Sequence, residues 1–276
     1  MASCQYQPTL PLTVLATFAH PDDEGFGCGG TLAALVAGGH RVTLICATNG
    51  DVGEISDPAL ATPETLGQVR QGELRAAMDV TGIDDVRFLN YRDSGMPGWE
   101  DNNHPNSLFQ APENRVVEQV AAVIREVRPD IVITHDPTGG YGHPDHVTIC
   151  QRTVAAVELC KDDATPLLYY VCFPRSFFQR MWNKMVELDL RPPFSADDTE
   201  ALGTPDDEVT TVLNVARYVA VKKESLERHR TQIERDGPFS KLPEEFMNEA
   251  MSTEFFQLAS SFNSPGRDIL AELPIE

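Results

Sequence analysis

The chain has 276 residues, of which 41% are hydrophobic and 23% charged, and its formal net charge at pH 7 is −20. Such a length and composition suit an ordinary globular protein with a sizeable core. The strong negative charge repels phosphate backbones and anionic lipid headgroups, so we expect neither nucleic acid nor a membrane as partner.

The sequence also bears on the compartment. The first apolar run, Leu12–Ala19, is too short to span a membrane, and no lysine or arginine precedes it. The six cysteines contain no C-x-x-C pair, and most of them lie in apolar runs, as buried thiols of a reducing compartment do. Cys28 follows an acidic cluster and is interpreted as structural. We therefore expect a cytoplasmic protein.

The first two-thirds of the chain alternates between strands and helices. Leu12–Ala19 is continuously apolar and bounded by prolines, which predicts a buried strand of a parallel sheet. A glycine-rich turn, 25–30, and a helix, 31–37, are predicted to follow. The same alternation predicts strands at 41–47, 86–89, 131–134 and 167–172, and helices at 64–80, 113–128 and 144–159. This pattern is typical of an α/β, Rossmann-like fold, a mostly parallel sheet with helices on both faces.

The rest of the chain is less regular. Residues 90–112 lack periodicity and are predicted to form a long loop, a feature that is often functional in compact domains. After residue 174 the sequence predicts a helix at 177–188, strands at 209–213 and 254–259, and a charged helix at 216–235 that presents a solvated outer face. We expect one domain over 1–276, with an α/β core at 1–173 that carries the site and a C-terminal elaboration at 174–276.

Two polar clusters follow predicted strands. His20-Pro21-Asp22-Asp23-Glu24 comes directly after the first strand, and His143-Pro144-Asp145-His146 comes after the strand at 131–134. In open α/β sheets, ligands bind just outside the carboxyl ends of the strands. Because two such strand ends can be neighbours in space, we expect the two clusters to form one metal site.

The residue types fit a catalytic metal. A catalytic zinc takes three protein ligands of N or O type and keeps one open position. His20 and Asp23 share a tight turn, and His146 is the natural third ligand from the other cluster. Such a ligand set also accepts Fe²⁺, Co²⁺ or Ni²⁺. Asp22 is then left beside the metal as general base towards an activated water.

The second cluster supplies further candidates. His143 is expected to stabilise or protonate developing charge, with Asp145 orienting it. The alternative is structural: Asp22 and Asp23 as turn and N-cap residues, and His143 to Asp145 as a plain helix start. That both clusters follow strands and both mix His with Asp favours the metal. The other histidines are interpreted as surface or turn residues, with one of them, His135, near enough to the site to be an exception: His40, His104, His135 and His229.

Four motifs carry a family resemblance. AHPDDE (19–24) and GGYGHPDHV (139–147), in this order, resemble the LmbE-like, or PIG-L, family of zinc-dependent N-acetylglucosaminyl deacetylases, and YRDSGM (91–96) and VRQGEL (69–74) also match. Among its members the chain looks most like the mycothiol-biosynthesis deacetylase and mycothiol S-conjugate amidase branch. The resemblance covers roughly residues 14–157. It departs from this branch at 25–28, and it does not extend past Pro174.

The resemblance implies roles for named residues. It implies that zinc is the metal and that its ligands are His20, Asp23 and His146. It implies that Asp22 is the general base. It also implies that His143, with Asp145 as its partner, stabilises the oxyanion or protonates the leaving amine. It also implies that Arg70 and Asp93 contact the sugar or its substituent, and that Tyr141 closes on the substrate. Without the family, Arg70 reads equally well as a surface helix charge paired with Glu73, and Asp93 as a turn residue.

We therefore expect a metal-dependent hydrolase that removes the N-acetyl group from an N-acetylglucosamine-type conjugate, a small-molecule amino-sugar partner. One alternative is an amidase that cleaves a larger amide, such as a thiol S-conjugate of a glucosaminide. An alternative of another class is a non-catalytic sugar- or nucleotide-binding module on the same fold, since a fold does not fix a function. The oligomeric state, a homo-oligomer included, is left open.

Overall fold

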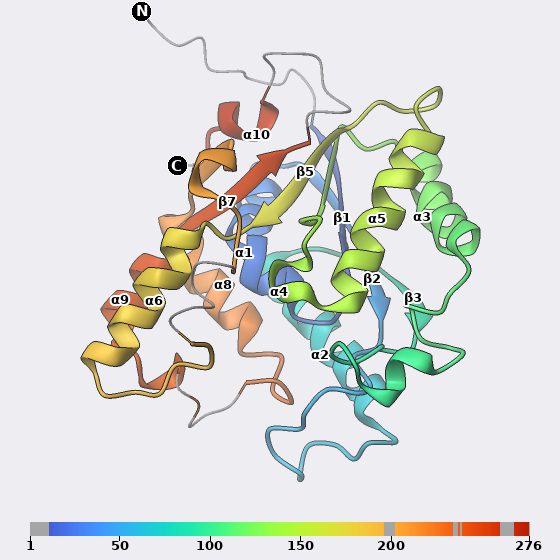
Figure 1. The fold of residues 1–276 in the computed structure, drawn as a ribbon. Coiled ribbons are helices and arrows are strands. Elements are labelled where there is room, and N and C mark those ends of the chain that lie inside the picture. The colour runs from blue at the N-terminus through green and yellow to red at the C-terminus, as the bar shows by residue number, and fades with distance from the viewer. Residues whose placement is uncertain (1–10, 196–201, 234–236, 238, 260–267, 276) are drawn as a thin grey trace, which may run out of the picture.

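The computed structural model describes residues 11–195, 202–233, 237, 239–259 and 268–275 (Figure 1). Seven strands form a sheet of order β3-β2-β1-β4-β5-β7-β6. Five of them run parallel: β1 (Thr13–Phe18), β2 (Arg41–Thr48), β3 (Asp85–Tyr91), β4 (Ile131–His135) and β5 (Leu167–Cys172). Antiparallel to β5 lies β7 (Thr253–Leu258), which also pairs with β6 (Thr211–Asn214). The predicted α/β, mostly parallel fold is confirmed.

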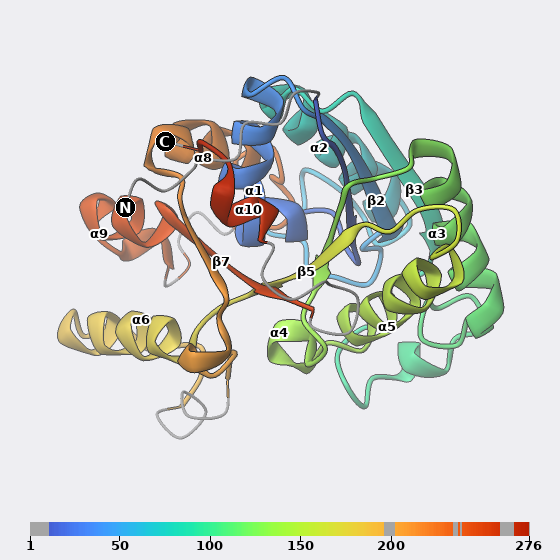
Figure 2. The same ribbon diagram turned by 90° about the horizontal axis from the view of Figure 1, so that it is seen from above.

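Helices cover both faces of the sheet (Figures 1 and 2). On one face lie α1 (Asp23–Ala37), α2 (Leu66–Thr81) and α8 (Val219–Leu226), and on the other lie α3 (Glu113–Val127) and α5 (Pro144–Leu159). A hydrophobic core lies on each face of the sheet, and alternate residues of β1 contribute to the two cores. Val14, Ala16 and Phe18 pack with α1 and α2, whereas Leu15 packs with α3 and α5. This period of two explains why the strand reads as continuously apolar.

Shorter elements complete the described chain. They are η1 (Glu100–Asn103), α4 (Gly139–Gly142), α6 (Arg175–Glu187), η2 (Asp206–Glu208), η3 (Ala216–Tyr218), η4 (Phe239–Lys241), α9 (Glu244–Met251) and α10 (Ile269–Glu272). Across the described ranges, no helix has both the length and the apolarity that crossing a bilayer requires.

The glycine-rich stretch 25–30 is helical, and the expectation of a turn there is wrong. It lies inside α1, which is interrupted only by non-helical angles at Cys28. A Cβ at Gly25 would lie 2.6 Å from a carbon of Leu226, and one at Gly27 would lie 2.5 Å from Val171. The glycines therefore allow close packing of α8 and β5 on the helix. Although 25–30 fits the pattern G-x-G-x-x-G, it forms no turn that could cradle a pyrophosphate.

The charged segment after residue 216 also differs from expectation. Helix α8 ends at Leu226, and Lys222 and Ser225 on it are buried. Behind it, His229 and Thr231 have no exposed surface. One face of the segment thus packs against α1 and α2, where Lys222 and His229 have buried partners, whereas charged side chains on its other face are exposed: Glu224, Glu227, Arg228 and Arg230.

The sheet order fixes where a ligand can sit. From β1 the chain passes to β2 on one side, and it later enters β4 on the other side of β1. At such a switch point the loops after the two central strands diverge and leave a crevice. His20 follows β1, and residues 143–146 follow β4 through the short helix α4.

Candidate metal centre

The turn after β1 is held in place from both sides. The carbonyl oxygen of Ala19 accepts from the Thr48 backbone nitrogen (2.8 Å) and from its hydroxyl (3.0 Å). The His20 backbone N–H donates to Oδ2 of Asp23 at 2.7 Å, which closes the turn and brings the Asp23 carboxylate beside the His20 ring. The Asp23 side chain therefore faces the crevice next to His20.

Two ring nitrogens and the two oxygens of one carboxylate converge between the two strand ends. Nδ1 of His20 lies 3.1 Å from Nε2 of His146 and 3.5 Å from Oδ2 of Asp23. Nε2 of His146 lies 3.3 Å from Oδ1 of Asp23. Both imidazoles are buried, with 8% and 4% exposure for His20 and His146. Two ring nitrogens and a carboxylate gathered in buried space form a donor set that suits a divalent transition metal.

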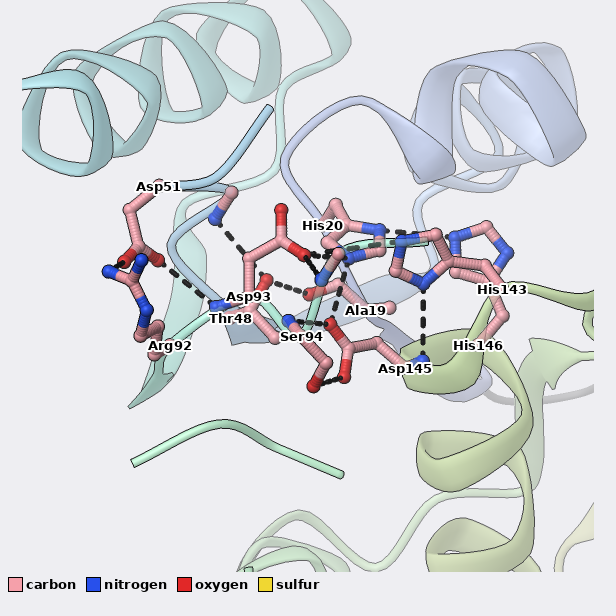
Figure 3. Close-up of polar contacts among 12 residues, drawn as sticks. Ala19, His20, Thr48, Asp51, Arg92, Asp93, Ser94, His143, Asp145 and His146 are labelled. Atoms are coloured by element: carbon pink, nitrogen blue, oxygen red, sulfur yellow. Dashed lines mark hydrogen bonds and ion pairs between the residues drawn. The ribbon is translucent and has the colours of Figure 1, made fainter. Parts of the chain in front are cut away.

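The far sides of both imidazoles have acceptors. Nε2 of His20 lies 3.2 Å from Oδ2 of Asp145 and 3.6 Å from Oδ1 of Asp93 (Figure 3). Nδ1 of His146 lies 3.1 Å from the carbonyl oxygen of Gly139. A hydrogen on each far nitrogen satisfies these acceptors and leaves the near nitrogens, which lie 3.1 Å apart, free to coordinate a metal. This arrangement is the one that metal-binding histidines need.

The carboxylates make the cluster attractive to a cation. Burial acts to lower the pKa of His20, but the facing carboxylates of Asp93 and Asp145 outweigh burial and raise this pKa well above its ordinary value. Burial acts to raise the pKa of Asp23, but His146 and His135 outweigh it and hold this pKa well below its usual range. Both pKa shifts show that ionised carboxylates stabilise positive charge at this place. A bound cation would be stabilised by the same carboxylates.

Asp145 and His143 do not pair as expected. The Asp145 carboxylate contacts His20 and accepts hydrogen bonds from the backbone nitrogen (2.8 Å) and the hydroxyl of Ser94. Nδ1 of His143 instead accepts from the Asp145 backbone nitrogen at 3.2 Å, and its Nε2 lies 4.0 Å from Oδ1 of Asp93. Neighbours at the start of α5 point in different directions, so the carboxylate nearest His143 comes from the 90–112 loop.

The protonation of His143 follows from this geometry. Burial, together with the charges of His20 and His146, lowers its pKa to about 3, so the ring is neutral at pH 7. Because Nδ1 accepts a hydrogen bond, the ring hydrogen is on Nε2. His143 can therefore donate a hydrogen bond from Nε2.

Asp22 occupies the N-cap position of α1, but its side chain makes no capping hydrogen bond. Its backbone is left-handed, with φ 119° and ψ −24°. Burial and the charge of Asp23 raise its pKa to about 7. A bound cation would lower this pKa again, so the pKa does not decide whether Asp22 is the base. The assignment depends instead on the position of Asp22 next to Asp23 in the chain and on its carboxylate, which is not used for capping.

Sequence reasoning underrated His135. The ring is 8% exposed and stacks on His146 with centroids 3.9 Å apart. Its Nε2 accepts from the Ala19 backbone nitrogen at 3.1 Å and lies 3.3 Å from Oδ2 of Asp23. Burial and the charge of His146 lower its pKa to about 4. The signal that was available was its position as the last residue of a central strand.

The three residues expected to contact substrate lie in different settings. Asp93 is buried beside His20, and its Oδ1 accepts from the Gly95 nitrogen at 2.8 Å. Tyr141 is 54% exposed, with its ring 5.2 Å from that of His146. Arg70 is buried and donates to the carbonyl oxygens of Gly50 (2.8 Å) and Glu54 (3.0 Å). The structure thus brings Asp93 and Tyr141 to the histidines, whereas two guanidinium nitrogens of Arg70 hold the loop after β2.

Large apolar side chains are exposed on the 90–112 loop. Trp99 and Phe109 are 45% and 50% exposed. Both are anchored near Asp145: a Cβ at Gly95 would lie 2.7 Å from the Trp99 ring, and the Phe109 nitrogen donates to the Ser94 hydroxyl at 3.0 Å. Exposed aromatic side chains of this kind are suited to contact the apolar face of a ring-shaped ligand.

Comparisons with known proteins match the part of the chain that carries this site. The PIG-L family model, described as GlcNAc-PI de-N-acetylase, matches residues 15–157. A 1D-myo-inositol 2-acetamido-2-deoxy-alpha-D-glucopyranoside deacetylase from Geodermatophilus obscurus is 37% identical over 267 residues, which is 89% of this chain and 91% of that protein. The match therefore extends well beyond the two motifs.

Two solved structures share the fold. The N,N'-diacetylchitobiose deacetylase from Pyrococcus horikoshii superposes with a TM-score of 0.60 at 22% identity, covering 90% of this chain and 83% of that one. The zinc-inhibited form of teicoplanin deacetylase Orf2 superposes with a TM-score of 0.54 at 18% identity, covering 90% and 99%. At these identities the likeness shows the architecture alone.

Proposed function

Because the chain belongs to the PIG-L family of de-N-acetylases, we propose that it removes the acetyl group from 1D-myo-inositol 2-acetamido-2-deoxy-α-D-glucopyranoside, the compound named for the Geodermatophilus obscurus relative. The observation that carries the proposal is the convergence of His20, Asp23 and His146, with Asp22 adjoining Asp23 in the chain and its carboxylate not used for capping. This is the arrangement that metal-assisted hydrolysis of an amide needs.

His20, Asp23 and His146 would hold the metal, which we propose is zinc. When bound there, zinc supplies a Lewis acid and lowers the pKa of a water molecule towards neutrality. Asp93 and Asp145 keep the hydrogen of His20 on its far nitrogen, and Gly139 does the same for His146. The protein thereby orients both ligating rings before the metal arrives.

Asp22 acts as general base. It takes a proton from water as the water oxygen forms a bond to the acetyl carbonyl carbon, and it returns the proton to the sugar nitrogen as the C–N bond breaks. Acetate and a free amine are the products. General acid–base catalysis of this kind contributes about 10²–10⁴-fold to the rate.

His143 stabilises the oxygen that gains negative charge. Its neutral ring donates from Nε2, because Nδ1 accepts a hydrogen bond from the Asp145 backbone nitrogen. A donor aimed at a developing oxyanion contributes about 10²–10³-fold in known cases. Tyr141, Arg70 and the exposed ring of Trp99 are proposed as substrate contacts, and of these Tyr141 lies beside His146.

Acetate release tests the proposal. Purified protein is stripped with a chelator, reloaded with zinc and incubated with the inositol conjugate, N-acetylglucosamine, N,N'-diacetylchitobiose and a thiol S-conjugate of a glucosaminide. We expect acetate and free amine in equal amounts, with the highest kcat/KM for the inositol conjugate and no turnover in the stripped protein. A mercapturate product without acetate would instead establish the larger-amide activity. Sugar binding without any product would establish a binding module.

A further inference from the structure

One peptide unit beside the metal ligands is held at both of its polar atoms. The Asp22 backbone N–H donates to Oε2 of Glu24 at 3.1 Å. The carbonyl oxygen of the same peptide, that of Pro21, accepts from Nε2 of Gln232 at 2.6 Å. Gln232 lies 211 residues further along the chain, so the C-terminal part reaches the turn that carries the metal ligands.

A buried histidine links these two partners. Nε2 of His229 lies 3.0 Å from Oε1 of Glu24, and its Nδ1 lies 3.4 Å from Nε2 of Gln232. Neither His229 nor Glu24 has more than 1% of its surface exposed. With the ring hydrogen on Nε2, His229 donates to Glu24 and accepts from Gln232, whose amide has a second hydrogen for Pro21. The side chains of Glu24, His229 and Gln232 and the Pro21–Asp22 peptide form a closed ring of hydrogen bonds.

The ring acts on an unfavourable backbone conformation. A left-handed conformation at a residue other than glycine is unfavourable and persists only where its surroundings impose it. At Asp22 the φ angle is 119°. The peptide that precedes Asp22 is held by the ring of hydrogen bonds. The carbonyl oxygen of Asp22, in the peptide that follows, accepts from the Gly25 (2.9 Å) and Phe26 (3.3 Å) nitrogens. With both flanking peptides fixed, the direction of the Asp22 side chain is fixed as well.

We propose that His229 and Gln232 are positioning residues that aim the Asp22 carboxylate by clamping the Pro21–Asp22 peptide through the buried ring with Glu24. The proposal rests on the proposed function, in which Asp22 is the base. Neither residue touches the reacting atoms, and both lie outside the residues that the family model matches.

The same segment offers a matched control. Thr231, between the two positioning residues, donates from its backbone nitrogen (2.9 Å) and its hydroxyl (2.6 Å) to Glu73 on α2. These bonds tie the segment to the protein but do not touch the Asp22 peptide. Replacement of the hydroxyl therefore separates loosening of the segment from loss of the clamp.

The experiment compares four variants of the full-length zinc-loaded protein. We expect Gln232→Met and His229→Leu to lower kcat about 10–100-fold, the range that a misaimed catalytic group produces, with KM and bound zinc unchanged. His229→Gln, which keeps a donor for Glu24, should recover most of kcat. Thr231→Val should lower Tm and leave kcat unchanged. Wild-type kcat in both Gln232→Met and His229→Leu would overturn the clamp while leaving the deacetylase proposal intact.

A second readout does not depend on activity. The Asp22 amide hydrogen should exchange with solvent faster in Gln232→Met than in the wild type, and a crystal structure of this variant should show a changed φ at Asp22. If the wild-type protein releases no acetate, the proposed function fails, and exchange and φ still decide on the clamp. An unchanged exchange rate together with an unchanged φ would refute it.

Discussion

Nε2 of His20 lies 3.2 Å from Oδ2 of Asp145, a carboxylate with no exposed surface that lies 125 residues further along the chain. The opposite nitrogen of the same ring faces His146 and Asp23. His20 therefore connects the proposed metal position with a buried carboxylate that the sequence suggested for another histidine. This relationship gives Asp145 a measurable part in metal binding.

Asp145→Asn should weaken zinc binding about 10–100-fold, because the carboxylate that orients His20 and raises its basicity is lost. Titration against a competing chelator measures the change. Asp268→Asn is the control: Asp268 is also a hydrogen-bonded carboxylate, bound to Tyr169 and Thr211 away from the histidines. It should leave zinc affinity unchanged. Equal affinities in wild type and Asp145→Asn would remove Asp145 from the metal site.

Asp22→Asn should keep one zinc per chain and lose about 10²–10⁴-fold in kcat, because asparagine tolerates the left-handed backbone but cannot accept the proton. His20→Ala should lose the zinc itself. Elemental analysis and acetate release on the same samples separate the two effects. An Asp22→Asn protein with wild-type turnover would show that another group is the base.

Lys222→Met should destabilise the fold by about 3–5 kcal/mol, the cost of leaving a buried charge without its partner. Nζ of Lys222 lies 2.6 Å from Oε1 of Glu254, and both side chains are almost fully buried. Glu254 also accepts from the Gly30 and Thr31 nitrogens at 2.8 and 2.7 Å, so the pair joins α8, β7 and α1. Urea unfolding measures the loss.

Lys184→Met is the matched control for this pair. Lys184 binds Glu187 at 3.0 Å on the surface of α6, where an ion pair contributes about 0–1 kcal/mol. If both lysine variants unfold at the same urea concentration, the Lys222–Glu254 pair contributes no more to the free energy of unfolding than the surface pair does.

The five described cysteines should resist alkylation in the folded protein at pH 8. They are Cys28, Cys46, Cys150, Cys160 and Cys172, all buried. Burial raises the pKa of Cys150 and of Cys172 to about 12, so at pH 8 only about one thiol in 10⁴ is a thiolate, the reactive form. Peptide mapping after iodoacetamide treatment, with and without urea, checks this. Labelling of Cys28 without urea would contradict the packing of α1.

The close approach of the three proposed metal ligands could be predicted, because each follows a strand with a strong apolar pattern. Continuous apolar runs place β1 and β4 inside a parallel sheet, and parallel strands end at the same edge. His20, Asp23 and His146 then meet as a consequence of topology. The pairing of Asp145 with His143 was wrong for a local reason: residues two apart on a helix do not face each other.

The interpretation of His229 as a surface or turn residue was also wrong. Its partner, Glu24, lies 205 residues away, and a single histidine in a charged segment carries no periodic signal. The prediction of a turn at the glycines of 25–30 was wrong for a related reason. Glycine marks both turns and close helix contacts, and only the position of Val171 and Leu226 distinguishes the two. Long-range packing therefore decided what local patterns could not.

The order of the strands also bears on how the chain folds during synthesis. Among the described strands β7 leaves the ribosome after all the others, yet it lies between β5 and β6 in the sheet. The edge of β5 that receives β7 therefore waits, with unpaired backbone groups, until residues 253–258 emerge. A nascent chain stalled shortly after β5 would already contain both motifs but would expose this edge to other chains. Synthesis of β7 thus covers an edge that could otherwise pair with another chain.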